Sequence, residues 1–508
     1  MTHSNIRVRF APSPTGALHI GGVRTALYNY LFAKKQGGAF ILRIEDTDQT
    51  RFVPGAEEYI VEAFRWLNIS FDEGVHVGGK YAPYKQSERK PIYKQYADEL
   101  IIKGKAYYAF DTPESLEALR KEYEGRKETF IYNVITRKTL CNSLNMTEAE
   151  VQHRLDSGEP FTVRFKIPED TDIAMHDLIR GNVTVHSNTL DDKVLFKSDG
   201  MPTYHLANIV DDHLMEISHV IRGEEWLPSM PLHVLLYDAF GWEKPQFAHL
   251  PLLLRPDGNG KLSKRDGDRL GFPVFPLEWN DPKTGEKSRG YREDGYFPEA
   301  VVNMLALLGW NPGTEQELFT MEELISTFSI ERVGKSGSKF DVEKAKWFNQ
   351  QYLRLYSDEA LATFFMPMLK EHEIEGVSKE YLVAVIGLIK DRANFVRDFW
   401  EQGWFFFKPP QQYDEQVIKK RWDENMPMIM NQLSQKIETI SDWNAVVIKE
   451  TIMQLITENS LNTGQIMNCL RLLMVGASIG PDLAEMMTVL GKEETLKRMS
   501  VKVLCNFN

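Results

Sequence analysis

The sequence has little cysteine and no long apolar run. Its 508 residues contain three cysteines, Cys141, Cys469 and Cys505, which lie far apart. Three separated thiols exclude a small fold held together by disulfides and favour a reducing compartment. No apolar stretch approaches the length that spans a membrane, and the N-terminus lacks the apolar stretch of a signal peptide. We therefore expect a cytoplasmic protein that does not contact a membrane.

Net positive charge is also absent. The chain carries 60 basic and 72 acidic residues, a formal net charge of -12 at pH 7. An acidic protein does not bind nucleic acid indiscriminately, but local basic clusters can still hold a polyanion. Such clusters occur at residues 335–346 and 419–421, although a solvated helix face is the simpler explanation of each one. The chain is 43% hydrophobic, so it can bury large cores, and its length predicts three or more domains.

The segment APSPTGALHIGG, from Ala11 to Gly22, joins a predicted strand to a predicted helix. Apolar and basic residues alternate over residues 6–10, as in a strand, and apolar residues have helical spacing over 23–36. In such a turn proline fixes the backbone, glycine lets a ligand approach closely, and the helix would aim free N–H groups at an anion. Taken alone, a segment of this kind is more often an ordinary turn than a phosphate site.

A second cationic segment, KLSKR from Lys261 to Arg265, follows the apolar run LPLLL and the turn RPDGNG. Three cations within five residues can neutralise a triphosphate, although a charge run alone is usually a solvated surface. In this order, and with a predicted strand before each, the two segments resemble the paired ATP-binding motifs of class I aminoacyl-tRNA synthetases.

Further stretches resemble the glutamyl-tRNA synthetases of the bacterial type. They cover nearly the whole chain and are RFAPSPTG, RIEDTD, QSER, PTYHLANIVDDH, VIRGEEW, YREDGYFPEA, FDVEKAKWFNQQYL and LLMVGASIGPDL. The resemblance implies a glutamate–tRNA ligase that activates L-glutamate with ATP, releases pyrophosphate, transfers glutamate to the 3′ end of tRNA-Glu and releases AMP. It also implies that activation requires tRNA. This chemistry needs no protein nucleophile, so we look for cations and hydrogen-bond donors.

The predicted fold class is α/β. We expect a doubly wound Rossmann-type catalytic domain (1–105 and 194–254), an inserted α+β acceptor-binding domain (106–193), a stem-contact region with KLSKR (255–338) and an all-α anticodon-binding domain (339–508). Strands are expected at 6–10, 39–45, 194–197, 217–222 and 248–254, and helices at 22–36, 55–67, 113–127 and 298–308. Beyond Phe340 amphipathic helices dominate, for example at 359–370, 380–393 and 463–473.

The nucleotide side of the site is assigned by the resemblance. His19 stands where the motif histidine contacts the ATP phosphates, and Lys264 where a lysine on a mobile loop stabilises the pyrophosphate leaving group. A histidine bonded within its own turn is the alternative reading of His19, and Gly22 replaces the second histidine of the general motif. The expected catalytic residues are His19 and Lys264, and the expected ATP-binding residues are His19, Gly21, Glu225, Trp226, Lys261, Lys264 and Arg265.

Glutamate has two carboxylates and one ammonium, so its pocket needs two cationic sites and one anionic or polar site. Arg9 and Arg222 each end a predicted strand, at the edge where doubly wound sheets bind ligands. Without the resemblance, a salt bridge to Asp or Glu explains either arginine equally well. Tyr204 and Asn208 are four residues apart and share a helix face. The resemblance implies the glutamate-binding set Arg9, Ser13, Glu45, Tyr204, Asn208 and Arg222, without deciding which arginine binds which carboxylate.

No metal site is predicted. The acidic and histidine residues between His205 and His219 lack a recognised ligand spacing, so structural or tRNA-facing roles are favoured. Some related enzymes carry a Cys/His zinc site in the acceptor domain, but here Ala109 stands at the corresponding start and Cys141 is alone. We expect ATP with Mg²⁺ and no zinc.

The expected partners are tRNA-Glu, L-glutamate and ATP, and the expected state is a monomer. Glutaminyl-tRNA synthetase is the nearest alternative, disfavoured by the helical C-terminal pattern and the KLSKR form. Length excludes a short glutamyl-queuosine tRNA enzyme. The intact motif residues disfavour a catalytically inactive tRNA-binding protein, and the long C-terminal half disfavours a small-molecule nucleotidylyltransferase. Residues 269–285 form a longer link than relatives usually have, with no predicted path.

Overall fold

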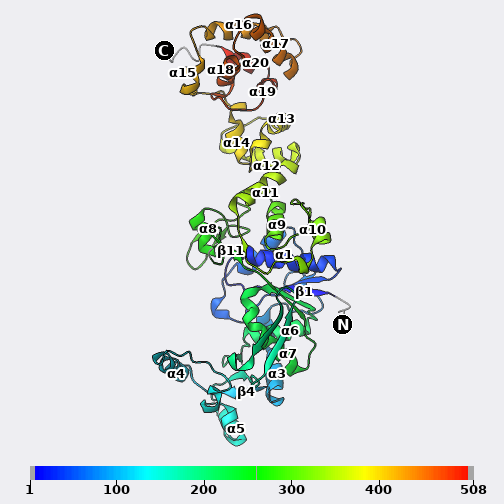
Figure 1. Ribbon diagram of the computed structural model, residues 1–508, viewed down its shortest axis with the longest axis vertical. Helices are drawn as coiled ribbons and strands as arrows, with labels where there is room; N and C mark the ends of the chain where they lie inside the picture. The colour runs from blue at the N-terminus through cyan, green and yellow to red at the C-terminus, as the bar shows by residue number, and fades with distance from the viewer. Residues whose placement is uncertain (1–5, 259, 501–508) are drawn as a thin grey trace. The chain divides into compact units, whose positions relative to one another are not determined.

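The structure is a computed structural model that describes residues 6–258 and 260–500, apart from the side chains of Lys264, Arg265 and Asp268. Figure 1 labels most of its helices and some of its strands. The chain divides into two compact units: Met1–Asp294 with Pro298–Ala345, and Gly295–Phe297 with Lys346–Asn508. Among the described residues, no helix combines the length and the apolar composition needed to cross a membrane.

The first half of the main sheet consists of three parallel strands. These are β1 (Arg7–Phe10), β2 (Ala39–Leu42) and β3 (Glu73–Gly74). Helix α1 (Ile20–Lys35) connects β1 to β2, and helix α2 (Ala56–Trp66) connects β2 to β3. All four residues of β1 are buried, so its two arginines need partners inside the protein. The strands predicted at 6–10 and 39–45 and the helices predicted at 22–36 and 55–67 are confirmed.

The second half of the main sheet lies beside β1. Its parallel strands are β9 (His219–Gly223), β10 (Gln246–Leu250) and β6 (Asp172–Asp177), and β7 (Gly181–His186) pairs antiparallel with β6. Ser218, just before β9, donates its backbone N–H to the carbonyl of Arg7 at 2.9 Å, which places β9 next to β1. The strand order therefore reverses at the boundary between β1 and β9. This topology confirms the doubly wound α/β class.

Three helices cover the second half of the sheet and form much of its core. They are α3 (Lys90–Ile102), α6 (Tyr204–Leu214) and α7 (Met230–Phe240), which pack against one another (Figure 1). Their buried side chains include Tyr93, Leu206, Val210 and Tyr237, in one cluster with Phe247 of β10. This packing fixes the position of α6, which carries two of the predicted site residues.

A second sheet is antiparallel and contains β4 (Ala106–Ala109), β5 (Thr162–Phe165) and β8 (Val194–Phe196), with helices α4 (Pro113–Gly125) and α5 (Glu148–Asp156) between β4 and β5. One predicted strand joins a different sheet, and a segment predicted to lie in the inserted domain joins the main sheet. The strand expected in the main sheet at 194–197 pairs with β5, whereas residues 172–186 extend the main sheet through β6 and β10. A short apolar run predicts a strand but does not identify the strand that it pairs with.

After β10 the chain forms several short elements. They are β11 (Leu253–Leu254), α8 (Lys264–Leu270), β12 (Trp279–Asn280), β13 (Lys287–Ser288), α9 (Pro298–Leu307), α10 (Met321–Thr327) and β14 (Ser338–Lys339). The backbone at Lys264 begins α8, so the loop expected at this residue is wrong. The N–H and hydroxyl of Ser263 donate to Oδ2 of Asp266 at 2.9 and 2.6 Å, and this capping box starts the helix.

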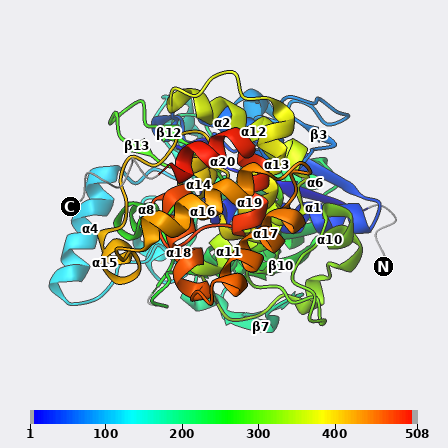
Figure 2. The same cartoon turned by 90° about the horizontal axis from the view of Figure 1, so that it is seen from above.

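The secondary structure of the second unit consists of helices in the residues that the structure describes. Helix α11 (Val342–Leu355) leads into it, followed by α12 (Asp358–Glu371), α13 (Lys379–Ile389), α14 (Asp398–Gly403), α15 (Glu415–Arg421), α16 (Met426–Glu438), α17 (Ala445–Glu458), α18 (Thr463–Val475), α19 (Leu483–Leu490) and α20 (Lys492–Met499). The last five pack as one bundle, drawn in orange and red in Figure 2. The helices predicted at 359–370, 380–393 and 463–473 are confirmed.

Candidate active site at the switch point of the sheet

A cavity of about 270 Å³ lies at the carboxyl ends of β1 and β9, where the strand order reverses. All six residues predicted to bind glutamate line this cavity, together with Gly21, Glu225 and Trp226. They come from β1 (Arg9), the turn after it (Ser13), the segment after β2 (Glu45), α6 (Tyr204 and Asn208) and β9 (Arg222). Segments far apart in the sequence therefore meet at the edge of the sheet where such folds bind ligands.

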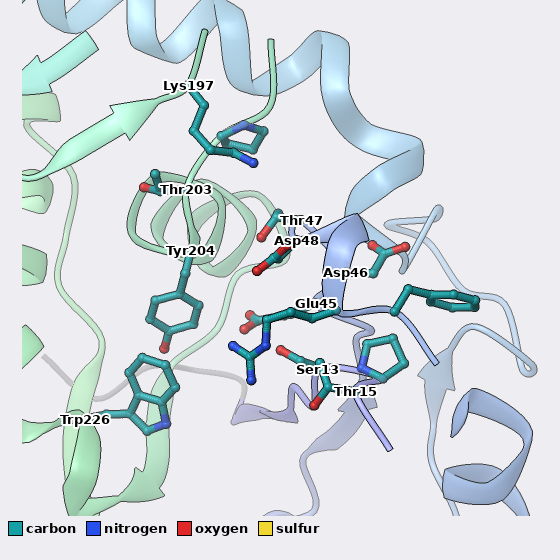
Figure 3. A pocket seen from close by; sticks show the side chains of 14 residues that line it. Ser13, Thr15, Glu45, Asp46, Thr47, Asp48, Lys197, Thr203, Tyr204 and Trp226 are labelled. Atoms are coloured by element: carbon teal, nitrogen blue, oxygen red, sulfur yellow. The ribbon is translucent and has the colours of Figure 1, made fainter. Parts of the chain in front are cut away.

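A second cavity of about 300 Å³ adjoins the first one, and both are lined by Ser13, Glu45, Tyr204 and Trp226. Figure 3 shows Tyr204 and Trp226 on one wall, across from Ser13 and Glu45. The rings of Tyr204 and Trp226 pack together, with 4.3 Å between their centroids. The part of the second cavity that the first one does not share is lined by Asp46, Thr47, Asp48, Lys197 and Thr203.

Arg9 is neutralised within the protein. Its Nε and Nη2 donate to the two carboxylate oxygens of Asp212 at 2.9 and 3.1 Å, and both side chains are buried. Burial by itself would lower the pKa of Arg9, but the charge and hydrogen bonds of Asp212 raise it above its usual value. Arg43 also contacts Asp212, at 2.8 Å. The salt-bridge interpretation of Arg9 is therefore correct, and Nη1 is the terminal nitrogen that does not donate to Asp212.

Arg222 has different surroundings. It is buried, but its hydrogen-bond acceptors are neutral: Nε2 of His249 at 3.0 Å, the hydroxyl of Tyr204 at 3.1 Å, Nδ1 of His233 at 3.3 Å and the carbonyl of Trp226 at 3.4 Å. Within the described residues none of its partners is a carboxylate. A buried guanidinium without a counter-charge strongly favours an anionic ligand beside it.

Glu45 and Asn208 supply the polar side of the same cavity. Oε1 of Glu45 accepts hydrogen bonds from Arg43 at 2.9 Å and from the amide nitrogen of Asn208 at 3.0 Å. Burial raises the pKa of Glu45, against the opposing effects of Arg43, Arg9 and the Asn208 hydrogen bond. The amide oxygen of Asn208 is buried and has no partner in the part of the chain that the structure describes. An unsatisfied buried acceptor of this kind suits a ligand ammonium group.

His19 caps helix α1, on the side of the site where the resemblance predicts ATP. Its Nδ1 accepts the N–H of Gly21 at 3.1 Å, and its ring lies edge-on to Phe275 with 6.3 Å between centroids. The N–H of Ile20 donates to the carbonyl of Val274 at 2.9 Å. The expectation of free N–H groups at this helix end is thus corrected, because the first two already have acceptors. A phosphate would replace these acceptors rather than fill an open position.

A third cavity of about 410 Å³ connects this helix end to the KLSKR segment, with His19, Gly21, Lys261, Ser263 and Glu225 in its wall. Lys261 and Glu225 form a half-exposed ion pair across it, 2.9 Å between Nζ and Oε1. The side chains of Lys264 and Arg265 lie outside the described residues, so their predicted contacts stay predictions. The structure does place Lys261, Leu262 and Ser263 of the same segment in the wall of the cavity that His19 lines.

The residues between His205 and His219 have structural contacts. Asp211 accepts hydrogen bonds from Gln86, Arg89 and Tyr93 at 2.7–2.9 Å, and His213 stacks on Trp242 with 3.8 Å between ring centroids. In the described residues, no three His, Cys, Asp or Glu side chains are placed to hold a metal ion. These contacts favour the structural reading for Asp211 and His213.

Sequence reasoning missed three residues around the site. Asp212 follows Tyr204 and Asn208 at the same four-residue spacing, so the helix-face argument that found them predicts it as well. Asp177 and His249, which hold Arg222 from behind, carry no such signal. They become visible only from the pairing of β6, β10 and β9, because His249 lies opposite Arg222 in that register.

Comparison with known proteins agrees with this geometry. Residues 5–347 match the family described as tRNA synthetases class I (E and Q), catalytic domain, and residues 359–502 match an anticodon binding domain. The chain is 58% identical to the glutamate–tRNA ligase of Phocaeicola vulgatus over 99% of this chain and 100% of that protein. It is 56% identical to the one of Porphyromonas gingivalis, over 98% of each chain.

Solved structures agree as well. The crystal structure of a glutamate tRNA ligase from Elizabethkingia meningosepticum in complex with its amino acid is similar, with a TM-score of 0.96, 53% identity, and coverage of 99% of this chain and 100% of that one. The doubly wound sheet, its charged switch-point cavity and the helical second unit together define a class I tRNA synthetase. Within this class the chain belongs to the E and Q family, which comprises the glutamate and glutamine enzymes.

Proposed function

We propose that this chain is a glutamate–tRNA ligase. In the first step an α-carboxylate oxygen of L-glutamate bonds to the α-phosphorus of ATP, the bond to the β-phosphate oxygen breaks, and pyrophosphate leaves. In the second step a ribose hydroxyl at the 3′ end of tRNA-Glu attacks the adenylate carbonyl, loses its proton and displaces AMP. The full-length similarity to glutamate–tRNA ligases supports this assignment.

The observation that carries the proposal is the asymmetry of the switch-point cavity. Arg222 brings a buried positive charge that no carboxylate of the described chain neutralises, and Glu45 with Asn208 brings acceptors for an ammonium group. Arg9 adds a donor without net charge because Asp212 pairs with it. A substrate with two carboxylates and one ammonium matches this set, and Ser13 and Tyr204 complete the lining.

The same set gives a physical basis for rejecting glutamine. An amide in place of the side-chain carboxylate would leave a buried guanidinium without its charged acceptor. Each lost charged hydrogen bond costs about 1.5 to 3 kcal/mol, which corresponds to discrimination of roughly 10- to 100-fold per bond.

The nucleotide side is assigned to ATP, which class I synthetases use. We place the adenosine near Glu225 and Trp226 and the phosphates near His19, Gly21 and the KLSKR segment. Lys261, Lys264 and Arg265 would offset the charge that develops on the leaving pyrophosphate, and Mg²⁺ bound to ATP would share that charge. Lys261 would exchange its half-exposed partner Glu225 for phosphate.

The remaining parts are assigned to tRNA. The β4–β5–β8 sheet with its helices would hold the acceptor end, the region 255–338 the stem, and the helical second unit the anticodon, in agreement with its match to an anticodon binding domain. We place the enzyme in the cytoplasm and expect it to act as a monomer without zinc.

ATP–pyrophosphate exchange tests the proposal. The purified chain is assayed with glutamate or glutamine, each with and without tRNA-Glu, and charging of tRNA-Glu and tRNA-Gln is measured in parallel. We expect exchange only with glutamate and tRNA together. Absence of glutamate-dependent exchange even with cognate tRNA would overturn the function, and preference for glutamine would support the glutaminyl alternative.

A further inference from the structure

Arg222 is held from behind by two residues outside the substrate cavity. Its Nε donates to Nε2 of His249 at 3.0 Å, and Nδ1 of His249 bonds to Oδ2 of Asp177 at 2.7 Å. Asp177 and His249 have no exposed surface, and Arg222 is 5% exposed. The three residues come from the ends of β6, β10 and β9, three adjacent parallel strands, so the sheet itself sets their spacing.

The hydrogen bonds fix where the proton on His249 lies. A guanidinium can only donate, so Nε2 of His249 must be the unprotonated, accepting nitrogen. The ring proton therefore sits on Nδ1 and is donated to Asp177. Burial and the charge of Arg222 lower the pKa of His249, while the hydrogen bond to Asp177 opposes them, and the balance keeps the ring neutral. Asp177 thus selects the one tautomer that can hold Arg222.

Asp177 is itself fixed by four donors. Oδ2 also accepts the backbone N–H of His249 at 3.0 Å, and Oδ1 accepts those of Ile179 and Arg180 at 2.9 and 2.8 Å. Burial alone would raise the pKa of Asp177, but these hydrogen bonds hold it below its usual value. The carboxylate is therefore ionised and cannot rotate without losing backbone hydrogen bonds.

The distance from each arginine to its acidic residue, Asp212 for Arg9 and Asp177 for Arg222, matters for ligand binding. Asp212 contacts Arg9 directly and occupies two of its nitrogens, so a ligand meets a guanidinium that is already paired. Asp177 acts on Arg222 through an imidazole ring, which anchors only Nε and keeps the Asp177 carboxylate out of direct contact with the guanidinium. A ligand carboxylate therefore competes with neutral acceptors at Arg222 and with no anion of the described chain.

We infer that Asp177 and His249 are positioning residues for the substrate: Asp177 fixes the tautomer of His249, and His249 aims the Arg222 guanidinium at a substrate carboxylate. This inference rests on the proposed function, because the carboxylate is that of glutamate. Neither residue lines the cavity, so both act only through Arg222.

The variant Asp177→Asn tests whether Asp177 fixes the tautomer of His249. An amide offers one acceptor and one donor where four N–H groups need acceptors. Each side of the amide would face two of these N–H groups, and only the His249 ring can adapt, by moving its proton from Nδ1 to Nε2, so we expect the new NH₂ to point toward His249. Nε2–H would then face Nε–H of Arg222. We expect the KM for glutamate to rise about tenfold, with the KM values for ATP and tRNA changed less than about twofold.

The matched control is Asp170→Asn, at an exposed Asp–His pair in which Asp170 lies 3.4 Å from His186. We expect this variant to behave as wild type. Substitutions of His249 give a second series in case Asp177→Asn folds poorly. A glutamine side chain offers an acceptor and a donor that can take over the contacts of the two ring nitrogens. His249→Gln should therefore retain glutamate affinity better than His249→Ala.

A double-mutant cycle shows whether Asp177 acts through Arg222. In an Arg222→Ala background, Asp177→Asn should have no further effect on the glutamate KM. An undiminished effect there, an equal rise in the KM for ATP, or a wild-type glutamate KM in folded Asp177→Asn and His249→Ala would each overturn the inference. If Arg222→Ala weakens glutamate while the Asp177 and His249 variants do not, the proposed function stands and only this inference fails.

Discussion

The proposed glutamate pocket and the proposed nucleotide side of the same cleft are stabilised in different ways. In the pocket, buried side chains hold one another: Asp212 holds Arg9, and His249 holds Arg222. On the nucleotide side, the end of α1 is capped by His19 and by the carbonyl of Val274, and Lys261 forms a half-exposed ion pair. The pocket is therefore preorganised, whereas the nucleotide side must exchange its present partners for phosphates.

Removing the Lys264 side chain should have the largest effect. It should slow ATP–pyrophosphate exchange without weakening tRNA binding. In Lys264→Ala we expect the rate of ATP–pyrophosphate exchange to fall on the order of 10²- to 10³-fold, because a charge that stabilises the leaving group is lost. Binding of tRNA, measured by filter retention, should stay within about twofold. Lys283→Ala, at an exposed lysine of the following segment, is the control. Equal losses of exchange and tRNA binding would contradict the role.

Arg9→Met tests whether the Arg9–Asp212 salt bridge stabilises the folded protein. The substitution leaves Asp212 buried with Arg43 as its remaining partner, so we expect the free energy of unfolding to fall by about 3 kcal/mol. Arg222→Met orphans no carboxylate of the described chain and should be clearly less destabilising. Urea unfolding of both variants measures the difference, and equal losses would remove the contrast between the two arginines.

Arg222→Ala should break the pocket alone. We expect kcat/KM for glutamate to fall roughly 10- to 100-fold, because at least one charged hydrogen bond to the substrate is lost. The KM for ATP should change less than about twofold. Steady-state exchange with one substrate varied at a time gives both values. A comparable loss for ATP would mean that the two sides are not separable.

Low pH should destabilise the folded protein through the partly buried His205–His233 pair. His205 bonds to His233 at 3.2 Å, and burial together with Lys193 and Arg222 lowers the pKa of His205 to about 4. The unfolded chain binds this proton near pH 6.5, so stability falls as pH drops from 6.5 toward 4, by about 2 kcal/mol at pH 5. His205→Gln should lose that much less between pH 7 and pH 5 in urea unfolding. Parallel pH profiles for the two proteins would refute this.

Much of the fold follows from periodicity. The strand at 6–10, the helix at 22–36 and the helices beyond Phe340 are long or regular enough to be read directly. Sheet partners are not, because pairing depends on distant segments: the strand at 194–197 pairs with β5 instead of joining the main sheet. The helix at Lys264 was missed although its Ser-x-x-Asp start is visible in the sequence.

For the site, too, some features could be predicted from the sequence and others could not. The resemblance named Arg9, Ser13, Glu45, Tyr204, Asn208 and Arg222, and the structure brings all six to one cavity. Their electrostatic states could not be read in advance, because Arg9 and Arg222 both end buried strands and differ only in what lies beside them. Asp212 comes from a helix and His249 from a neighbouring strand, and only the folded chain shows which arginine each one holds.

The proposed function depends on the unneutralised Arg222 taking the side-chain carboxylate of the substrate and so selecting a dicarboxylic amino acid. The most direct test is the ratio of kcat/KM for glutamate to that for glutamine in tRNA-dependent ATP–pyrophosphate exchange. The account predicts a ratio of at least about tenfold in favour of glutamate, and a much smaller ratio in Arg222→Ala. Equal use of the two amino acids by the wild-type chain, or an unchanged ratio in the variant, would contradict it.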